Sequence, residues 1–192
     1  MIITGGSLRG RKLGVLSGGR TRPTPARVKE ALFSILATQV PGARVLDLFA
    51  GSGALGFEAL SRGAAEVVFV EAHPPTAAML RETAVRFGIA EKCTIICGRS
   101  ERSVSRLQGT FRLVFADPPY ALPAPLPLFE ELTTGGFLDD DAVIVYEHQA
   151  QRGVRELPAV LAVERQTHWG EVGVSFLRKV SAHSSRDLPR VI

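Results

Sequence analysis

Residues 45–56 read Val45-Leu46-Asp47-Leu48-Phe49-Ala50-Gly51-Ser52-Gly53-Ala54-Leu55-Gly56. The stretch opens with a short, almost wholly apolar run, which is typical of a parallel strand covered on both faces. The glycines that follow allow a sharp turn and let a ligand approach the backbone without a β-carbon in the way. A helix is expected to start at the end of the stretch. In a doubly wound α/β fold such a loop lies at the carboxyl end of the first strand, where ligands bind.

The remainder of the chain continues this alternation of strands and helices. The patterns predict strands at 44–49, 66–71, 94–97, 113–116, 142–147, 160–167 and 172–178, and helices at 25–38, 53–62, 75–87, 100–107 and 126–134. Because no helix separates the last two strands, they are expected to form an antiparallel hairpin. The sequence therefore predicts an α/β domain at 25–180, a basic arm or hairpin at 1–24, and a disordered tail at 181–192.

The glycine loop is compatible with two nucleotide cofactors. Gly51, Gly53 and Gly56 fit the dinucleotide pattern G-x-G-x-x-G, so an NAD enzyme is one hypothesis. Asp47 argues against it, because a carboxylate beside this loop would repel a pyrophosphate. The same carboxylate suits the sulfonium and ammonium groups of S-adenosylmethionine, and the exposed N–H groups at the helix start suit its carboxylate. The loop therefore favours S-adenosylmethionine.

Further cofactor contacts are expected where the next two strands end. Glu71 ends the second strand, and an acid there can accept hydrogen bonds from both ribose hydroxyls of either cofactor. Ser100 follows the third strand, where it either contacts adenine or caps the next helix, and capping is the favoured interpretation. The predicted cofactor site consists of Asp47, Phe49, Ala50, Gly51, Gly53, Glu71, Ala72, Arg99 and Ser100.

The most specific motif is Asp117-Pro118-Pro119-Tyr120, which directly follows the fourth strand. The exocyclic amine of a base is a poor nucleophile, because its lone pair is delocalised into the ring. A carboxylate and a backbone carbonyl that accept its N–H bonds would localise that lone pair, and Asp117 and Pro118 can supply them. The two prolines fix these acceptors in place, and Tyr120 offers a face on which an extruded base can stack. The four residues are the predicted catalytic residues, and we expect proton loss to follow methyl transfer.

Positive charge is concentrated at the start of the chain. The formal net charge of the chain is +4. The first 29 residues carry seven basic groups and no acidic group, whereas the remaining residues have a net charge of −3. Such a segment suggests a polyanionic partner such as nucleic acid, although a solvated basic arm is the simpler alternative. The predicted RNA-binding residues are Arg9, Arg11, Lys12, Arg20, Arg22, Arg27 and Lys29.

Composition excludes several other classes of protein. An apolar fraction of 45% with 22% charged residues is ordinary for a globular domain. No apolar run reaches the roughly 20 residues that a membrane span needs, and the first residues do not resemble a signal peptide. The cysteines and histidines show no metal-ligand spacing, so no metal site is expected. We expect a cytoplasmic protein, monomeric, with no membrane contact.

In combination, these motifs resemble a known family. Arg22-Pro23-Thr24, the run from Arg27 to Phe33, the glycine loop and Asp117-Pro118-Pro119-Tyr120 are together similar to the bacterial 16S rRNA guanine-N2 methyltransferases of the small ribosomal subunit. The resemblance covers residues 1–180 and implies a Rossmann-like class I methyltransferase fold with a mostly parallel seven-stranded sheet. It also implies methylation of one guanine in a small-subunit rRNA hairpin, presented by the 30S subunit or an assembly intermediate. The family often has Asp or Asn after the third strand, where this chain has Arg99 and Ser100.

Three alternatives remain open at this point. An amino-methyltransferase of DNA or tRNA would use the same motifs. An NAD-dependent oxidoreductase would bind NAD and not S-adenosylmethionine. A non-catalytic RNA-binding assembly factor would function unchanged without the Asp117 carboxylate.

Overall fold

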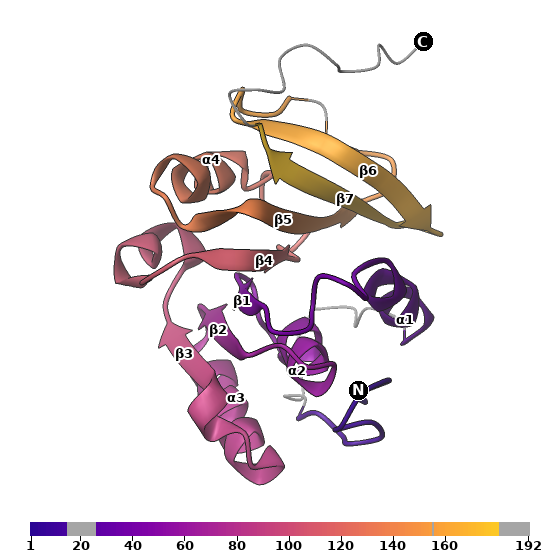
Figure 1. Ribbon diagram of the computed structural model, residues 1–192, viewed down its shortest axis with the longest axis vertical. Helices are drawn as coiled ribbons and strands as arrows, with labels where there is room; N and C mark the ends of the chain where they lie inside the picture. The colour runs from indigo at the N-terminus through magenta and orange to yellow at the C-terminus, as the bar shows by residue number, and fades with distance from the viewer. Residues whose placement is uncertain (15–25, 155, 181–192) are drawn as a thin grey trace.

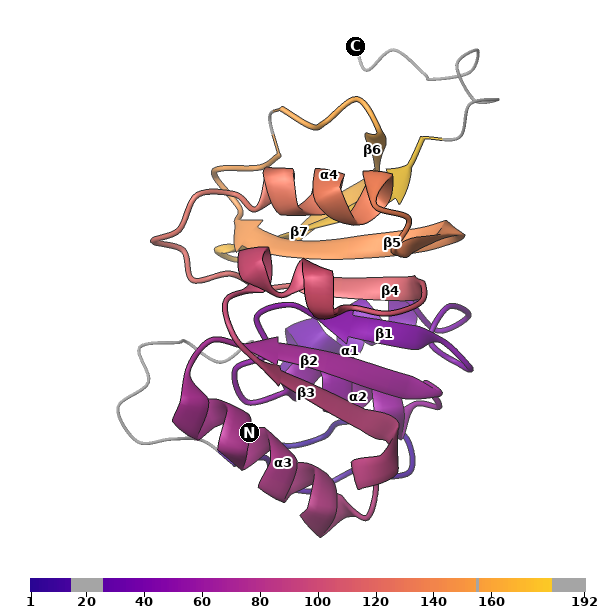
Figure 2. The ribbon, with the colours of Figure 1, turned by 90° about the vertical axis from the view of Figure 1, so that its left-hand side faces the viewer.

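A seven-stranded mixed sheet forms the centre of the computed structural model, which describes residues 1–14, 26–154 and 156–180. The strand order is β3-β2-β1-β4-β5-β7-β6, and Figure 2 shows the sheet from β3 upward. β7 runs antiparallel to β5 and β6, whereas the other paired strands are parallel. The predicted fold and C-terminal hairpin are therefore confirmed. The strands are β1 (Arg44–Asp47), β2 (Glu66–Glu71), β3 (Cys93–Cys97), β4 (Phe111–Ala116), β5 (Leu138–Gln149), β6 (Leu161–Trp169) and β7 (Val172–Lys179).

Helices cover both faces of this sheet (Figure 1). α1 (Ala26–Ile35), α2 (Ala54–Ser61) and α3 (Pro74–Phe87) pack on one face, and α4 (Leu126–Thr134) packs on the other. The near-continuous apolar runs of the central strands follow from this, because both faces of each strand are buried. Among the residues that the structure describes, no helix is long and apolar enough to cross a membrane.

The prediction of a regular helix at 100–107 is wrong, because this segment is not α-helical. The segment consists of two 3-10 turns, η2 (Ser100–Arg102) and η3 (Val104–Arg106), and a third turn, η1 (Ala90–Lys92), precedes β3. Serine hydroxyls in this segment compete for backbone carbonyls, and the Ser103 hydroxyl donates to the Arg99 carbonyl at 2.8 Å. Residue 25, where the first helix was expected to begin, lies outside the described residues, as does the tail predicted at 181–192.

The order of the strands creates one switch point. From β1 the chain proceeds outward through β2 to β3, then returns and inserts β4 on the other side of β1. The connections on the two sides of β1 therefore leave opposite faces of the sheet. In folds of this class the ligand-binding crevice lies at such a point, outside the carboxyl ends of the strands, which here are β1 and β4. The glycine loop follows β1. Residues Asp117-Pro118-Pro119-Tyr120, called the Asp117 turn from here on, follow β4. Both sequence motifs thus lie at the edge where this fold binds ligands.

The first 14 residues form a small hairpin that packs on the domain. Ile2 and Lys12 make an antiparallel bridge, and the Leu13 amide donates to the Met1 carbonyl at 3.0 Å. Ile3, Leu8 and Leu13 are buried in the core on the α1–α3 face. The described part of the basic segment is therefore anchored to the domain by apolar contacts.

A buried carboxylate joins this hairpin to α1 and α2. Glu58 of α2 is fully buried and accepts hydrogen bonds from the Thr4 and Gly5 amides at 2.9 and 2.8 Å. Lys29 of α1 is 1% exposed, and its Nζ lies 2.9 Å from Glu58 and 2.6 Å from the Ile2 carbonyl. Burial alone would raise the pKa of Glu58, but the Thr4 amide, Lys29 and Arg62 outweigh it and lower the pKa below its usual value.

Replacing Glu58 by glutamine should destabilise the fold by about 3–5 kcal/mol, because the buried Lys29 would lose its counter-ion. Urea denaturation at neutral pH measures this loss. Glu66→Gln is the matched control, since it removes a partly exposed ion pair with Arg44 worth about 0–1 kcal/mol. The lowered pKa stabilises the folded state above the unfolded pKa of Glu58, so this stabilisation should fade as the pH falls through the folded pKa. Equal denaturation midpoints for Glu58→Gln and the wild-type protein would contradict this account.

Candidate active site

Two glycines in left-handed conformations shape the loop after β1. Gly51 has φ 51° and Gly53 has φ 74°. A β-carbon on Gly53 would lie 2.6 Å from the Phe57 ring and 2.7 Å from Leu80, so both the backbone and the packing require glycine there. A β-carbon on Gly51 would meet only the Phe49 carbonyl oxygen, at 3.9 Å. Packed side chains therefore fill the space beside Gly53, whereas the space beside Gly51 is open. This leaves room for a ligand against the backbone at Gly51.

Asp47 ends β1 beneath this loop. Its side chain is 3% exposed and accepts a hydrogen bond from the Gly56 amide at 3.1 Å. Burial raises the pKa of Asp47 to about 7, with a smaller contribution from the nearby Glu71 carboxylate, while the Gly56 bond acts in the opposite direction. A buried acid with this pKa is ready to ionise when a cation comes within reach.

Glu71 lies against the same loop from the end of β2. One carboxylate oxygen accepts the Gly51 amide at 2.8 Å, and the other accepts the His73 amide at 2.7 Å. These bonds hold the carboxylate at the edge of the crevice. Phe49 is partly buried, and Ala72 and Arg99 are exposed on the neighbouring loops.

Ser100 does not cap a helix, which corrects the favoured prediction. It is the first residue of η2, and its hydroxyl donates to the Leu48 carbonyl just past β1. This bond crosses the switch point and fixes the glycine loop to the segment after β3. The adenine contact proposed for Ser100 stays a prediction.

Three acidic residues share one face of the sheet at this edge. Asp47 is in register with Phe115, and Val145 is in register with Phe115 on the other side. Because side chains alternate along a strand, Asp117 and Glu147, each two residues further on, lie on that same face. Burial, then Glu147 and then Asp47, raise the pKa of Asp117 well above its usual value.

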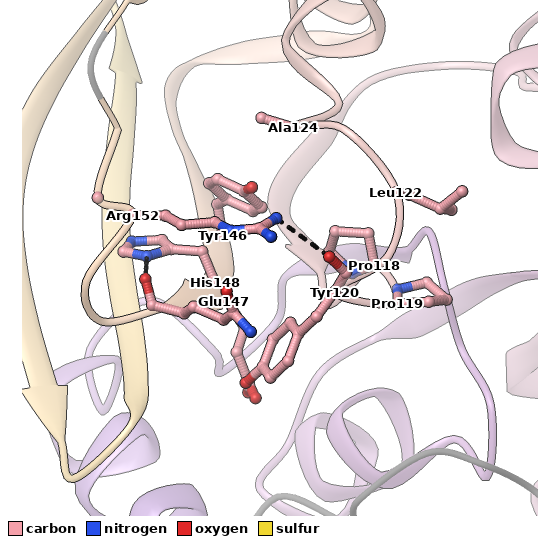
Figure 3. A pocket seen from close by; sticks show the side chains of 11 residues that line it. Pro118, Pro119, Tyr120, Leu122, Ala124, Tyr146, Glu147, His148 and Arg152 are labelled. Carbon is pink, nitrogen blue, oxygen red and sulfur yellow. Dashed lines mark hydrogen bonds between the residues drawn. The ribbon is translucent and has the colours of Figure 1, made fainter.

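The Asp117 turn also borders a pocket at the carboxyl ends of β4 and β5 (Figure 3). Arg152, from the loop after β5, donates to the Tyr120 carbonyl at 3.1 Å and so connects the two loops that form the walls. Tyr120 is 37% exposed, which is high for a large aromatic side chain. The lining consists of Pro118, Pro119, Tyr120, Leu122, Ala124, Tyr146, Glu147, His148, Gln149, Arg152 and Gly153.

The sequence reasoning missed the contribution of β5 and its loop to this pocket. Tyr146, Glu147 and His148 lie near the end of β5, directly after its apolar run at 142–145, and a polar run at the carboxyl end of a strand next to β4 is the signal that identifies them. Arg152 had no comparable signal, because its position depends on how the loop folds back. No group of three or more His, Cys, Asp or Glu that could hold a metal ion occurs within the described ranges.

The basic residues predicted to bind RNA divide into three groups. Arg9, Arg11, Lys12 and Arg27 are exposed. Lys29 is buried against Glu58 and the Ile2 carbonyl, so its predicted role in RNA binding is wrong: the charge is already neutralised inside the fold. Arg20 and Arg22 lie outside the described residues.

Comparison with known proteins identifies close relatives along almost the whole chain. The ribosomal RNA small subunit methyltransferase D of Escherichia coli is 33% identical over 96% of this chain and 93% of its own length. The protein of the same name from Haemophilus influenzae is 35% identical over 78% of this chain and 79% of its own length. The solved structure of Escherichia coli yhhF superposes with a TM-score of 0.83 at 31% identity, covering 93% of this chain and 97% of that protein.

A family model described as conserved hypothetical protein 95 matches residues 1–178. The match spans the N-terminal hairpin, the glycine loop, the Asp117 turn and the C-terminal strands. The resemblance to small-subunit rRNA methyltransferases is thereby confirmed, and the chain belongs to this family.

Proposed function

We propose that this chain transfers a methyl group from S-adenosylmethionine to the exocyclic N2 of a guanine in 16S rRNA. The observation that carries the proposal is the juxtaposition, at one switch point, of the Asp117 turn with the glycine loop and Asp47. The small-subunit rRNA methyltransferases among its relatives support the reaction and the kind of RNA. Of the alternatives, an NAD enzyme receives no support from these relatives.

The crevice fits the three charges of S-adenosylmethionine. The open space above Gly51 accommodates the methionine part against the loop backbone, with Phe49, Ala50 and Gly53 beside it. Asp47 faces the cationic groups, and Glu71 and Ala72 border the ribose. Arg99 and Ser100 lie where adenine is expected. The bound cofactor supplies an electrophilic methyl group on a sulfonium.

The chain's own residues orient the nucleophile. The Asp117 carboxylate and the Pro118 carbonyl accept the two N–H bonds of the guanine amine, while Tyr120 stacks on the base. With S-adenosylmethionine bound, the amine lone pair would form the new bond to the methyl carbon, and the electron pair of the broken carbon–sulfur bond would stay on sulfur. The nitrogen, now positively charged, gives its extra proton to Asp117. The raised pKa of Asp117 makes its carboxylate a competent acceptor for that proton.

The exposed arginines and Lys12 of the N-terminal region are suited to rRNA phosphates. Such contacts position the RNA without reading its sequence. Arg9, Arg11, Lys12 and Arg27 are exposed and available for this. Arg20 and Arg22 are proposed from the sequence alone to make further phosphate contacts. The substrate is proposed to be a hairpin in the 30S subunit or an assembly intermediate, and the enzyme a cytoplasmic monomer.

Asp117→Ala should lower single-turnover methyl transfer by about 10²–10⁴-fold, because the variant has neither the oriented acceptor nor the proton acceptor. Labelled cofactor and 30S particles lacking the modification provide the assay, and mass mapping locates the methylated atom. Cofactor affinity should stay within a few-fold of wild type. Asp140→Ala, at an exposed acid on β5, is the control and should leave the rate unchanged. Full activity of the Asp117 variant would refute the mechanism.

Cofactor affinity should depend on pH through Asp47. Below its pKa of about 7 the free carboxyl is protonated, and pairing with the cofactor's ammonium group requires it to lose that proton. The affinity for S-adenosylhomocysteine, measured by calorimetry, should therefore fall as the pH falls below about 7. The Kd should rise by a factor that approaches about ten-fold per pH unit. Asp47→Asn, which leaves Asp117 and Glu147 in place, should bind more weakly at high pH and lose most of this dependence. An unchanged pH profile in that variant would exclude Asp47 as the group responsible.

Arg9→Gln and Arg27→Gln should each weaken rRNA binding and reduce its salt dependence. The slope of log affinity against log salt concentration should become shallower by about 0.7–0.9 for each rRNA phosphate that the variant no longer neutralises. Lys179→Gln on β7 serves as the charge-matched control, since it removes one positive charge near the opposite edge of the sheet. If all three variants changed the slope equally, the N-terminal surface would have no special role.

A further inference from the structure

We propose that Glu147 selects guanine by accepting the N1–H of the base whose N2 amine is held by Asp117. The inference rests on the proposed function and deepens it, because it assigns the discrimination between purines to a residue on β5. Glu147 would contact the substrate through the ring nitrogen next to the reacting amine. The assignment follows from its position, its burial and the chemistry of the guanine edge.

The register of the central strands brings the two acids together. Ala116, the last residue of β4, pairs with Tyr146 of β5, so Asp117 directly follows β4 beside Glu147, the next residue of β5. Continuing the alternation of side chains past Phe115 and Val145 places both on the same face of the sheet, and Glu147 lies close enough to contribute to the raised pKa of Asp117. Two carboxyl groups therefore lie beside each other at the edge where the base is expected.

Glu147 is buried, yet it lines the pocket. Its side chain is 7% exposed, and it borders the same space as Pro118 and Tyr120. In Figure 3 the side chains of Glu147 and Tyr120 point toward each other from the two walls. A base stacked on Tyr120, with its amine at Asp117, would thus present its Watson–Crick edge toward Glu147.

The chemistry of that edge distinguishes guanine from adenine. Guanine carries two adjacent groups of donors, the N1–H and the N2 amine, and two adjacent carboxylates can accept from both. Adenine has a lone pair at N1 and no amine at C2. A carboxylate opposite that lone pair would be repelled, and a buried acceptor would be left without a donor. A site of this kind rejects the wrong base strongly, because rejection comes from unsatisfied polar groups.

The end of β5 is held firmly enough for such selection. His148 is buried between the Gln149 carbonyl, 2.9 Å from Nδ1, and the Ser175 hydroxyl, 2.8 Å from Nε2. A β-carbon on Gly173 of β7 would lie 2.6 Å from His148, so the neighbouring strand packs directly on the ring. Glu147 precedes this fixed residue, and Arg152 joins the following loop to Tyr120. The acceptor is therefore preorganised, as selection at one ring atom requires.

The charges around Glu147 agree with a binding site for donors. Burial of Asp117, repulsion from Glu147 and a smaller repulsion from Asp47 together raise the pKa of Asp117. Arg152 is the cation on the same pocket wall. Ionising Asp117 and Glu147 together is therefore unfavourable in the free protein. The N–H groups of guanine would relieve this repulsion, whereas adenine would not.

The test compares guanine with 2-aminopurine, which keeps the C2 amine but has a lone pair at N1 and no oxygen at C6. Small-subunit particles are reconstituted with ligated 16S rRNA that carries either base at the nucleotide modified by the wild-type enzyme. Wild type should favour guanine strongly in kcat/KM. Glu147→Ala should lower kcat/KM for guanine about 10–100-fold and change that for 2-aminopurine by less than about three-fold. Glu131→Ala, at an exposed acid on α4, should change neither.

Glu147→Gln provides an independent arm that also covers the case of a misfolded alanine variant. Its carbonyl can still accept the guanine N1–H, and its amide can donate to N1 of 2-aminopurine. The variant should retain most activity on guanine and gain activity on 2-aminopurine. The inference is overturned if either Glu147 variant loses activity equally on both bases, or if neither variant changes the preference. Absence of wild-type methylation at any guanine N2 would instead overturn the proposed function itself.

Discussion

β1 and β4 lie side by side in the middle of the sheet, and their pairing extends one step beyond β1, where the Leu48 amide donates to the Phe115 carbonyl at 3.0 Å. The chain leaves these two strands in opposite directions, so the glycine loop and the Asp117 turn diverge from a common edge. The Ser100 hydroxyl bonds to the Leu48 carbonyl at that point. The pairing of β1 with β4 therefore sets the distance between the glycine loop, which is proposed to bind the cofactor, and the Asp117 turn, which is proposed to bind the base.

The same pairing forces acidic side chains together. Asp47 and Asp117 share a face because parallel strands in register present their alternate residues to the same side, and β5 adds Glu147. Burying three carboxyl groups in one region is unfavourable, and the raised pKa values of Asp47 and Asp117 express that cost. Active sites commonly keep such an arrangement because a ligand resolves it. In the proposed complex, the cationic groups of the cofactor would offset the unfavourable burial of Asp47. The N–H donors of guanine would do the same for Asp117 and Glu147.

The features predictable from sequence were those with a local pattern. Strands β1 to β4 and the central part of β5 are short, mainly apolar runs. The glycine loop and Asp117 turn directly follow β1 and β4, so their shared edge followed from the general rule for α/β folds. Lys29 was misjudged because charge alone does not reveal burial, and its partner Glu58 is 29 residues away on another helix. Ser100 was misjudged because its acceptor, the Leu48 carbonyl, is 52 residues away. Contacts of this kind depend on tertiary packing and leave no periodic signal.

Glu58 shows how the N-terminal region and the cofactor loop are mechanically connected. α2 begins directly after Gly53, and one turn later Glu58 binds the Thr4 and Gly5 amides and Lys29. The hairpin that carries Arg9 and Arg11 is therefore fastened to the helix that starts at the proposed cofactor site. RNA held by that hairpin would be fixed relative to the glycine loop without any direct contact between them. A buried ion pair contributes little net stability over an apolar pair, but it fixes orientation, because its hydrogen bonds are satisfied in only one arrangement. Orientation is what methyl transfer between two separately bound substrates requires.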